Sequence, residues 1–320
     1  MTLAAGIHPD VPADAYHADP APAPSLSAGL AATLVQRTPL HAWTESGRLN
    51  PAHQSEPASG EQDEGTALHA LLLEQHDLVV PVEAADWRTK AAQESRAAIR
   101  AEGKVPILAA RWDALRACAD AFRANIARHQ IGDFTQRPGR AEVTMLWQDE
   151  AEDGAIWCRS RTDWLCDDGS DAMIDLKTLG GTADPDAWAR QNKDAALRAA
   201  HYLRGARALG IRRPRYLFCL LERNPPYALA VCELSPALLT IGEEQHQVAR
   251  NLWAACLKDG EWPAFPPFLA TVEASSGALY AHEDWRQRQQ QIRERKPKPF
   301  AGQASERIAS TIRSGGEPFA

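Results

Sequence analysis

A change in the character of the sequence near residue 140 constrains the fold of this chain more than any other feature. Three short segments, AEVTMLWQ (141–148), IWCRSRTDWLC (156–166) and AMIDLKT (172–178), alternate in polarity and are rich in β-branched and aromatic residues, as strands are. The turn sequences EDG and DDGSD separate them. The pattern predicts a three-stranded antiparallel meander.

Helical segments surround this meander. We expect helices after an N-cap at Ser25 or Ser27 and over 61–75, 88–102, 108–128, 184–210 and 236–258. Asp184 and Pro185 suit the start of the 184–210 helix, and Gly210 suits its end. Two more strands, PRYLFCLLER and YALAVCELS, flank the turn NPP. This order predicts a mixed α/β fold in which helices flank a central mixed sheet.

We divide the chain into an irregular N-terminal segment (1–24), one main domain (25–275) and a basic polar tail (276–320). From Arg286 to Ala320 there are eight basic and three acidic residues, a net charge of +5, whereas the whole chain carries −7. A basic tail can meet phosphates, or it can be a solvated end.

The N-terminus lacks the basic and apolar regions of a secretory signal, and no stretch approaches the roughly 20 apolar residues of a membrane span. We therefore expect a cytoplasmic protein without a membrane partner. The six cysteines form no CxxC pair, so we expect neither a zinc site nor an iron–sulfur cluster.

The hairpin RTDWLCDDGSDAMIDLKT (161–178) carries charges at positions where apolar residues would pair better. With Gly169 at the centre of its turn, Asp163 pairs with Asp175, and Arg161 pairs with Lys177. Asp175 and Lys177 then share a face, because side chains two residues apart on a strand point the same way. This register would fail if the pairing slipped by one residue.

Two opposed carboxylates cost about 0.2–1 kcal/mol, and more when desolvated, unless a cation lies between them. Mg²⁺ prefers carboxylate oxygens and can lower the pKa of a bound water, while a nearby lysine can stabilise charge on a phosphate. The arrangement suits metal-assisted hydrolysis of a phosphodiester. The alternative is a solvated strand face with a weak, exposed Asp175–Lys177 pair.

Two further helices carry candidate residues. In GTALH, Gly65 lies one turn before His69 and would leave space beside the imidazole, although His69 could simply be a histidine at the edge of the core. Arg198 and Tyr202 are four residues apart and share a helix face. They could contact a nucleic-acid backbone, buttress the site or serve ordinary helix packing.

Taken in order, G-x-x-x-H, Asp163, Asp-Leu-Lys at 175–177 and a helix with Tyr202 resemble the RecB-like branch of the PD-(D/E)xK nucleases. The flanking sequences SLSAGLAATLVQRTPLHAW, GTALHALLLE, RTKAAQESRAAIRAEGK and LERNPPYALAVCELS are similar to the RecE-type (exonuclease VIII-like) phage and prophage exonucleases. The resemblance covers about residues 12–275.

The resemblance implies a PD-(D/E)xK core that binds one or two Mg²⁺ ions, for which Mn²⁺ would substitute. It implies that His69, Asp163, Asp175 and the backbone carbonyl of Leu176 are metal ligands, with Glu142 a weaker candidate. Lys177 would be the catalytic lysine, acting with Asp163 and Asp175.

The implied reaction is 5′-to-3′ digestion of one strand of linear double-stranded DNA in phage-type recombination. The implied partners are DNA ends, a single-strand annealing protein and further copies of the chain in a ring-like homo-oligomer.

One departure from the family pattern is that Arg198 stands where the family has Gln. Arg161, Arg198, Tyr202 and Lys90 are our candidates for DNA contacts, with Lys90 in a possible basic stripe that also includes Arg88, Arg96 and Arg100. Two other functions remain open. One is a DNA-end-binding protein with a vestigial site, and the other is a nuclease with endonuclease or single-strand activity.

Overall fold

The computed structural model describes residues 2–54, 59–73 and 76–294. The chain divides into two compact units, Met1–Phe265 and Pro266–Ala320. The described part of the second unit contains the helix α10 (Ser276–Glu294), whose large apolar side chains, such as Trp285, are exposed. Residues 276–294 of the predicted polar tail are therefore helical, and residues 295–320 lie outside the described part of the chain.

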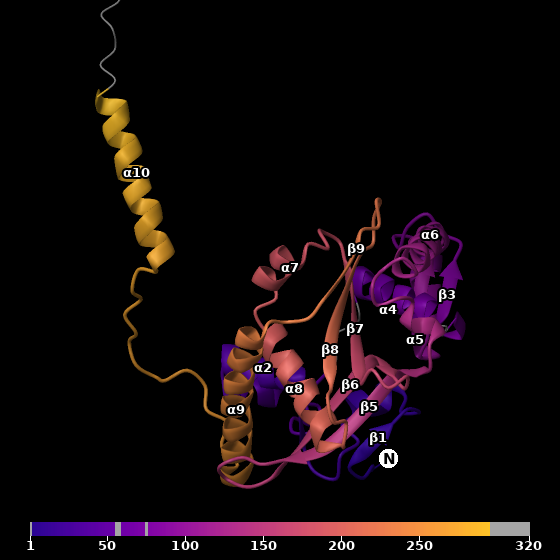
Figure 1. The fold of residues 1–320 in the computed structure, drawn as a ribbon, viewed down its shortest axis with the longest axis horizontal. Coiled ribbons are helices and arrows are strands. Elements are labelled where there is room, and N and C mark those ends of the chain that lie inside the picture. The colour runs from indigo at the N-terminus through magenta and orange to yellow at the C-terminus, as the bar shows by residue number, and fades with distance from the viewer. Residues whose placement is uncertain (1, 55–58, 74–75, 295–320) are drawn as a thin grey trace, which may run out of the picture. The chain divides into compact units, whose positions relative to one another are not determined.

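A seven-stranded mixed sheet forms the centre of the first unit (Figure 1). Its strands are β1 (Gly6–His8), β2 (Ser25–Ser27), β5 (Gly139–Asp149), β6 (Ile156–Cys166), β7 (Ala172–Leu179), β8 (Arg215–Glu222) and β9 (Leu229–Cys232). The order is β1-β5-β6-β7-β8-β9, and β2 also pairs with β6. The antiparallel meander β5-β6-β7 is as predicted, and the two strands expected on either side of NPP form the antiparallel pair β8-β9. They join through a parallel β7-β8 pair.

Helices cover both faces of this sheet (Figure 1). On one face lie α2 (Ala28–Gln36), α8 (Ala195–Ala208) and α9 (Pro236–Asp259), and on the other lie α4 (Gly60–Leu72), α5 (Lys90–Ala101) and α6 (Ala109–Ile126). The second layer also holds a small parallel sheet of β3 (Val79–Val82) and β4 (Val105–Leu108). Alternation along β8 fills both cores, because Phe218 faces the first layer and Leu217 faces the second.

Several helix ends follow the local sequence rules. The Ser27 side chain caps α2 by accepting a hydrogen bond from the Leu30 N–H, and Asp184 likewise caps α7 (Pro185–Gln191). Close packing of α8 against α9 depends on Gly242, because a Cβ there would collide with the Ala196 carbonyl. Among the described residues, no helix is both long and apolar enough to cross a membrane.

Two sequence-based expectations about secondary structure were wrong. The helix expected over 184–210 is broken into α7 and α8 at Asn192, whose backbone leaves the helical region at φ −103° and ψ 74° and whose side chain donates to the Trp188 carbonyl. The segment expected to be irregular, 1–24, contains β1 and the short helix α1 (Ala13–His17). A further short helix, α3 (Pro39–Glu45), follows α2.

Candidate active site

The site lies where β6 and β7 separate. The ladder between them consists of the pairs Trp164–Ile174 and Leu165–Met173, which confirms the predicted register. The ladder does not extend to the expected pairs Asp163–Asp175 and Arg161–Lys177, and further along β6 residues 157–159 pair with β2. At the fork the Leu176 N–H donates to Asp163 Oδ2 at 2.6 Å, so the carboxylate replaces the missing strand partner.

Helix α8 supplies hydrogen bonds to the part of β6 near the fork. The Tyr202 hydroxyl donates to the Arg161 carbonyl at 2.7 Å, and His201 Nε2 lies 2.9 Å from the Arg159 carbonyl. A buried carbonyl without a partner is costly, so these side chains help the two strands to diverge. Tyr202 therefore supports the site by holding the β6 backbone at Arg161. Its contact with DNA stays a prediction.

Helix α4 brings His69 to the fork. Ser59 and Gln62 form a reciprocal capping box at its start, which fixes where the helix begins. A Cβ at Gly65 would lie 3.4 Å from Thr178 Oγ1, so Gly65 allows α4 to approach β7. The space that we expected Gly65 to leave beside His69 is thus filled by β7, which packs closely against α4. His69 Nδ1 lies 3.9 Å from Asp163 Oδ2.

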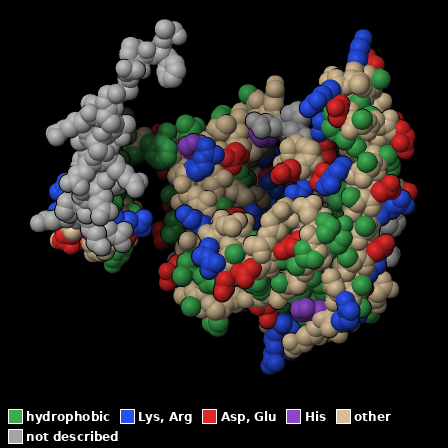
Figure 2. All heavy atoms as spheres, turned by 90° about the horizontal axis from the view of Figure 1, so that it is seen from above, with side chains coloured by type: hydrophobic (Ala, Val, Ile, Leu, Met, Phe, Trp, Pro, Cys, Tyr) green, Lys and Arg blue, Asp and Glu red, His purple; other side chains and the backbone are tan. Residues whose placement is uncertain are grey.

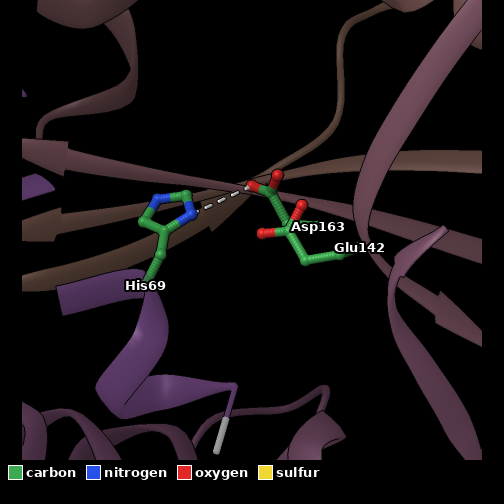
Figure 3. A group of neighbouring side chains, drawn as sticks. All are labelled: His69, Glu142 and Asp163. Carbon is green, nitrogen blue, oxygen red and sulfur yellow. Dashed lines mark ion pairs between the residues drawn. The ribbon is translucent and has the colours of Figure 1, made fainter. Parts of the chain in front are cut away.

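His69, Glu142 and Asp163 form a cluster in which one possible ligand atom from each lies within 4.8 Å of the others (Figure 3). The β5-β6 register places Glu142 directly opposite Asp163, between the pairs Ala141–Trp164 and Val143–Thr162. Glu142 has φ +55°, which is unusual for a residue other than glycine and marks local strain. The three donors suit a divalent cation, since carboxylate oxygens and a neutral imidazole are common metal ligands.

The electrostatics of the fork also favour a bound cation. Burial raises the pKa of Asp163 to about 6, His69 opposes this increase, and the Asp175 carboxylate adds to it. The Asp163 side chain is 16% exposed, so water does little to offset the repulsion. A cation held between these groups would stabilise the ionised form.

Asp175 and Lys177 lie next to the cluster on β7. Lys177 Nζ is 2.7 Å from Asp175 Oδ2, and Asp175 is 5% exposed. Asp175 is thus buried and Lys177 is partly exposed. The alternative of a weak, solvent-exposed Asp175–Lys177 pair does not describe this arrangement. The three-residue cluster includes Glu142, the weaker candidate, and does not include Asp175. Metal ligation by Asp175 and by the Leu176 carbonyl stays a prediction.

The structure places the candidate DNA-contact residues in different surroundings. Arg161 Nε donates to Glu142 Oε2 at 2.6 Å. Arg198 pairs with Asp194 at 3.0 Å. Burial lowers the pKa of Arg198, but the nearby Tyr202 and Asp175 raise it, and the net pKa is above the ordinary value. Lys90 is exposed at the start of α5, 3.7 Å from Glu94.

The expected basic stripe on α5 is interrupted. Arg96 and Arg100 both bind the buried Asp63 of α4, at 2.7 and 2.8 Å. They therefore tie α5 to the helix that carries His69, while Arg88 and Lys90 remain solvent-exposed.

The N-terminal segment contributes to the site, which the sequence reasoning missed. The Tyr16 ring lies under the guanidinium groups of Arg159 and Arg161, at 5.6 and 6.0 Å. Asp19 forms an ion pair with Arg159 at 3.2 Å. The segment is rich in Pro and Ala and has no hydrophobic periodicity. Its single aromatic residue Tyr16 and the charged Asp19 were the only sequence signals that it packs against the sheet.

A cavity of about 640 Å³ lies against the N-terminal segment and α2. Its polar lining is mixed in sign, with His17, Arg48 and Arg159 facing Asp14 and Asp19. The three cluster residues do not line it. From above, the molecular surface is hollowed, and basic and acidic side chains lie together in the hollow (Figure 2).

The comparisons with known proteins support the fold. No family model and no curated protein matches this chain. A crystal structure from Eubacterium rectale described as a "putative exonuclease" has a TM-score of 0.53 at 13% sequence identity, covering 88% of this chain and 99% of that chain. The chain therefore shares the overall fold of that protein, a mixed sheet flanked by helices. The RecE-type assignment stays a prediction.

Two weaker likenesses carry no argument. One is to the structure of SSO0001, with a TM-score of 0.25 and 14% identity over 57% of this chain and 84% of that chain. The other is to Rai1 of Scheffersomyces stipitis in complex with 3′-NADP⁺ and a calcium ion, with a TM-score of 0.26 and 11% identity over 69% and 66%.

Proposed function

We propose that this protein is a metal-dependent nuclease that hydrolyses phosphodiester bonds in DNA. The observation that carries the proposal is the convergence of His69, Glu142 and Asp163 from three separate elements at the β6–β7 fork. The pair Asp175 and Lys177 adjoins them. The likeness of the fold to a protein described as an exonuclease supports the same interpretation.

Four side chains at the fork are the proposed metal ligands. Asp163, Glu142 and His69 would hold a divalent cation, with Asp175 as a further ligand. Mg²⁺ is the expected ion, because three of these four donors are carboxylates, and Mn²⁺ would substitute. When bound, the metal would polarise a phosphoryl oxygen and lower the pKa of a coordinated water.

Lys177 would act on the phosphate. Its ammonium lies 2.7 Å from the buried Asp175 carboxylate and compensates that charge. The side chain is one-third exposed, so it can turn toward a phosphate in the site. There it would stabilise the negative charge that develops in the transition state. Arg198, whose charge lies near Asp175, would contribute a second positive charge.

The finer proposal is a 5′-to-3′ exonuclease acting on linear double-stranded DNA in phage-type recombination. It rests on the resemblance of the sequence to RecE-type enzymes. The same resemblance underlies the proposed ring-like homo-oligomer and the proposed annealing-protein partner.

The test is digestion of end-labelled linear duplex and of closed circular DNA by wild type and by Asp175→Ala, in Mg²⁺ or in EDTA. We expect Mg²⁺-dependent digestion of the linear duplex by the wild type only, and the labelled end that disappears first would give the polarity. Digestion of circular DNA would indicate an endonuclease instead. End binding without digestion would indicate a vestigial site.

A further inference from the structure

Glu142 has an unusual environment for a candidate metal ligand. Its Oε2 atom accepts a hydrogen bond from Arg161 Nε at 2.6 Å, from the neighbouring strand β6. A carboxylate has two oxygens, so Glu142 can bind Arg161 with one and offer the other to a cation. The strained backbone at Glu142, with φ +55°, holds the side chain where both contacts are within reach.

Arg161 is itself fixed from three directions. Its Nη1 donates to the Val11 carbonyl at 2.6 Å, and its own carbonyl accepts from the Tyr202 hydroxyl at 2.7 Å. The Tyr16 ring lies 6.0 Å from the guanidinium carbon. The side chain is only 15% exposed. A guanidinium held in this way is poorly placed to meet the backbone of a bound DNA strand.

We propose that Arg161 is a positioning residue, which orients the Glu142 carboxylate toward the metal rather than contacting DNA. Tyr202 and the N-terminal residues Val11 and Tyr16 hold Arg161 in place. The N-terminal segment is then a working part of the metal site. This inference rests on the proposed function, because it assumes that the cluster binds a divalent cation.

The alternative is the role that the sequence suggested, in which Arg161 binds a DNA phosphate. The two roles predict different measurements. Groups that orient a metal ligand change metal affinity by roughly 10–100-fold when removed. A residue that contacts a phosphate instead changes the salt dependence of DNA binding, by about one unit of slope per contact.

The experiment measures Mn²⁺ binding to the full chain by titration calorimetry for wild type, Arg161→Gln, Glu142→Gln and the double variant. We expect Arg161→Gln to weaken Mn²⁺ binding roughly 10–100-fold. Because Arg161 acts through Glu142, the double variant should bind Mn²⁺ about as weakly as Glu142→Gln alone. Additive losses would overturn the proposal.

A second measurement keeps the test decisive if Arg161→Gln folds poorly. Tyr202→Phe removes only the hydroxyl that holds the Arg161 carbonyl, and we expect a smaller loss of Mn²⁺ affinity. Arg215→Gln is the matched control, since Arg215 also binds a glutamate, Glu233, through two hydrogen bonds at 2.9 Å on β8. It should leave Mn²⁺ affinity unchanged.

DNA binding in EDTA separates the two roles. For a positioning residue, Arg161→Gln leaves the salt slope of duplex binding unchanged, whereas a slope smaller by about one would show a phosphate contact and overturn the proposal. Asp163→Asn tests the proposed function separately. If the wild type binds no Mn²⁺, or Asp163→Asn binds it equally well, the metal site itself fails and the inference fails with it.

Discussion

Two polar clusters lie along the same pair of strands, and they solve the problem of buried charge in opposite ways. At one end of β5, Asp149 binds Arg204 through two hydrogen bonds and Arg250 at 3.3 Å, so two guanidinium groups surround one buried carboxylate. Arg250 also donates to the Glu150 carbonyl. This cluster has enough positive charge without a metal.

At the other end of β5, the fork cluster has too little positive charge. Among the described residues, Glu142 and Asp175 each pair with one permanent cation, Arg161 and Lys177, and Arg198 lies near Asp175 but pairs with Asp194. Asp163 has no permanent cation as an ion-pair partner in the described part of the chain, and its pKa is raised chiefly by burial. The difference teaches that burial alone does not mark a site. A cation is expected where carboxylates are buried and their charge is not compensated.

The largest expected effect separates the two clusters by activity. Asp175→Asn should abolish digestion of linear DNA, by about 10³-fold or more, because metal ligation supplies several kcal/mol to the transition state. Lys177→Met should cost about 10²–10³-fold in kcat, since it removes one stabilising charge. Initial rates on end-labelled duplex measure both.

The matched controls for these variants are Asp167→Asn and Lys258→Met, which alter ion pairs with Arg140 and Asp153 away from the fork. Both should keep wild-type rates. Equal losses in the controls would mean that the fork residues have no special role.

The second effect is on stability. Asp149→Ala should lower the free energy of unfolding by about 3–5 kcal/mol, because it leaves the buried Arg250 without its carboxylate. Urea unfolding measures the change. Activity per folded molecule should stay the same, and a loss of turnover without a loss of stability would contradict the structural role of this cluster.

The third effect is a gain in stability at the fork. In EDTA at pH 7.5, Asp163→Asn should raise the free energy of unfolding by on the order of 1–3 kcal/mol, since Asn keeps an acceptor for the Leu176 N–H and removes the disfavoured charge. The metal-free wild type holds the Asp163 proton more tightly when folded. This group therefore costs stability as the pH rises from about 4 to about 6.

That loss should disappear in Asp163→Asn, and Mg²⁺ should restore stability in the wild type alone. Thermal unfolding at pH 5.0 and 7.5, with and without Mg²⁺, checks both points. A destabilised Asp163→Asn protein in EDTA would show that the Asp163 charge is already compensated.

The smallest effect concerns a buried histidine pair beside the Asp149 cluster. His201 Nε2 donates to the Arg159 carbonyl, so its Nδ1 must accept from His246 Nε2 at 2.9 Å. His246 Nδ1 then has no hydrogen-bond partner among the described residues. Burial lowers the pKa of His201 to about 4 and holds that of His246 well below its usual value.

The unfolded chain therefore binds more protons between about pH 4 and 6.5, and stability is lost as the pH falls through this interval. His246→Gln keeps a donor to His201 and removes one titrating group. Between pH 7.5 and 5 we expect it to lose about 1–2 kcal/mol less than the wild type. The exposed His282→Gln is the control and should follow the wild-type curve.

The local sequence determined the register of the hairpin and where several helices begin. The turn at Gly169 and the alternation around it predicted the β6–β7 register, which the pairs Trp164–Ile174 and Leu165–Met173 confirm. The cap at Asp184 was predicted correctly, and of the two residues expected for the first cap, Ser25 or Ser27, the structure uses Ser27. These features depend on hydrogen bonds and side-chain periodicity within a few residues, so a single sequence contains them.

The sequence by itself thus determined the mixed sheet, the register of the hairpin and the residue types gathered for chemistry. Only the tertiary structure decided how far the ladder runs, because the Asp163 carboxylate accepts the Leu176 N–H in place of a strand partner, and β2 pairs with β6 further along. The β5-β6 pairing brings Glu142 opposite Asp163, and packing of the N-terminal segment places Val11 and Tyr16 against Arg161. Contacts between segments this far apart in the chain leave no local periodicity, so they follow from the packing of the whole sheet.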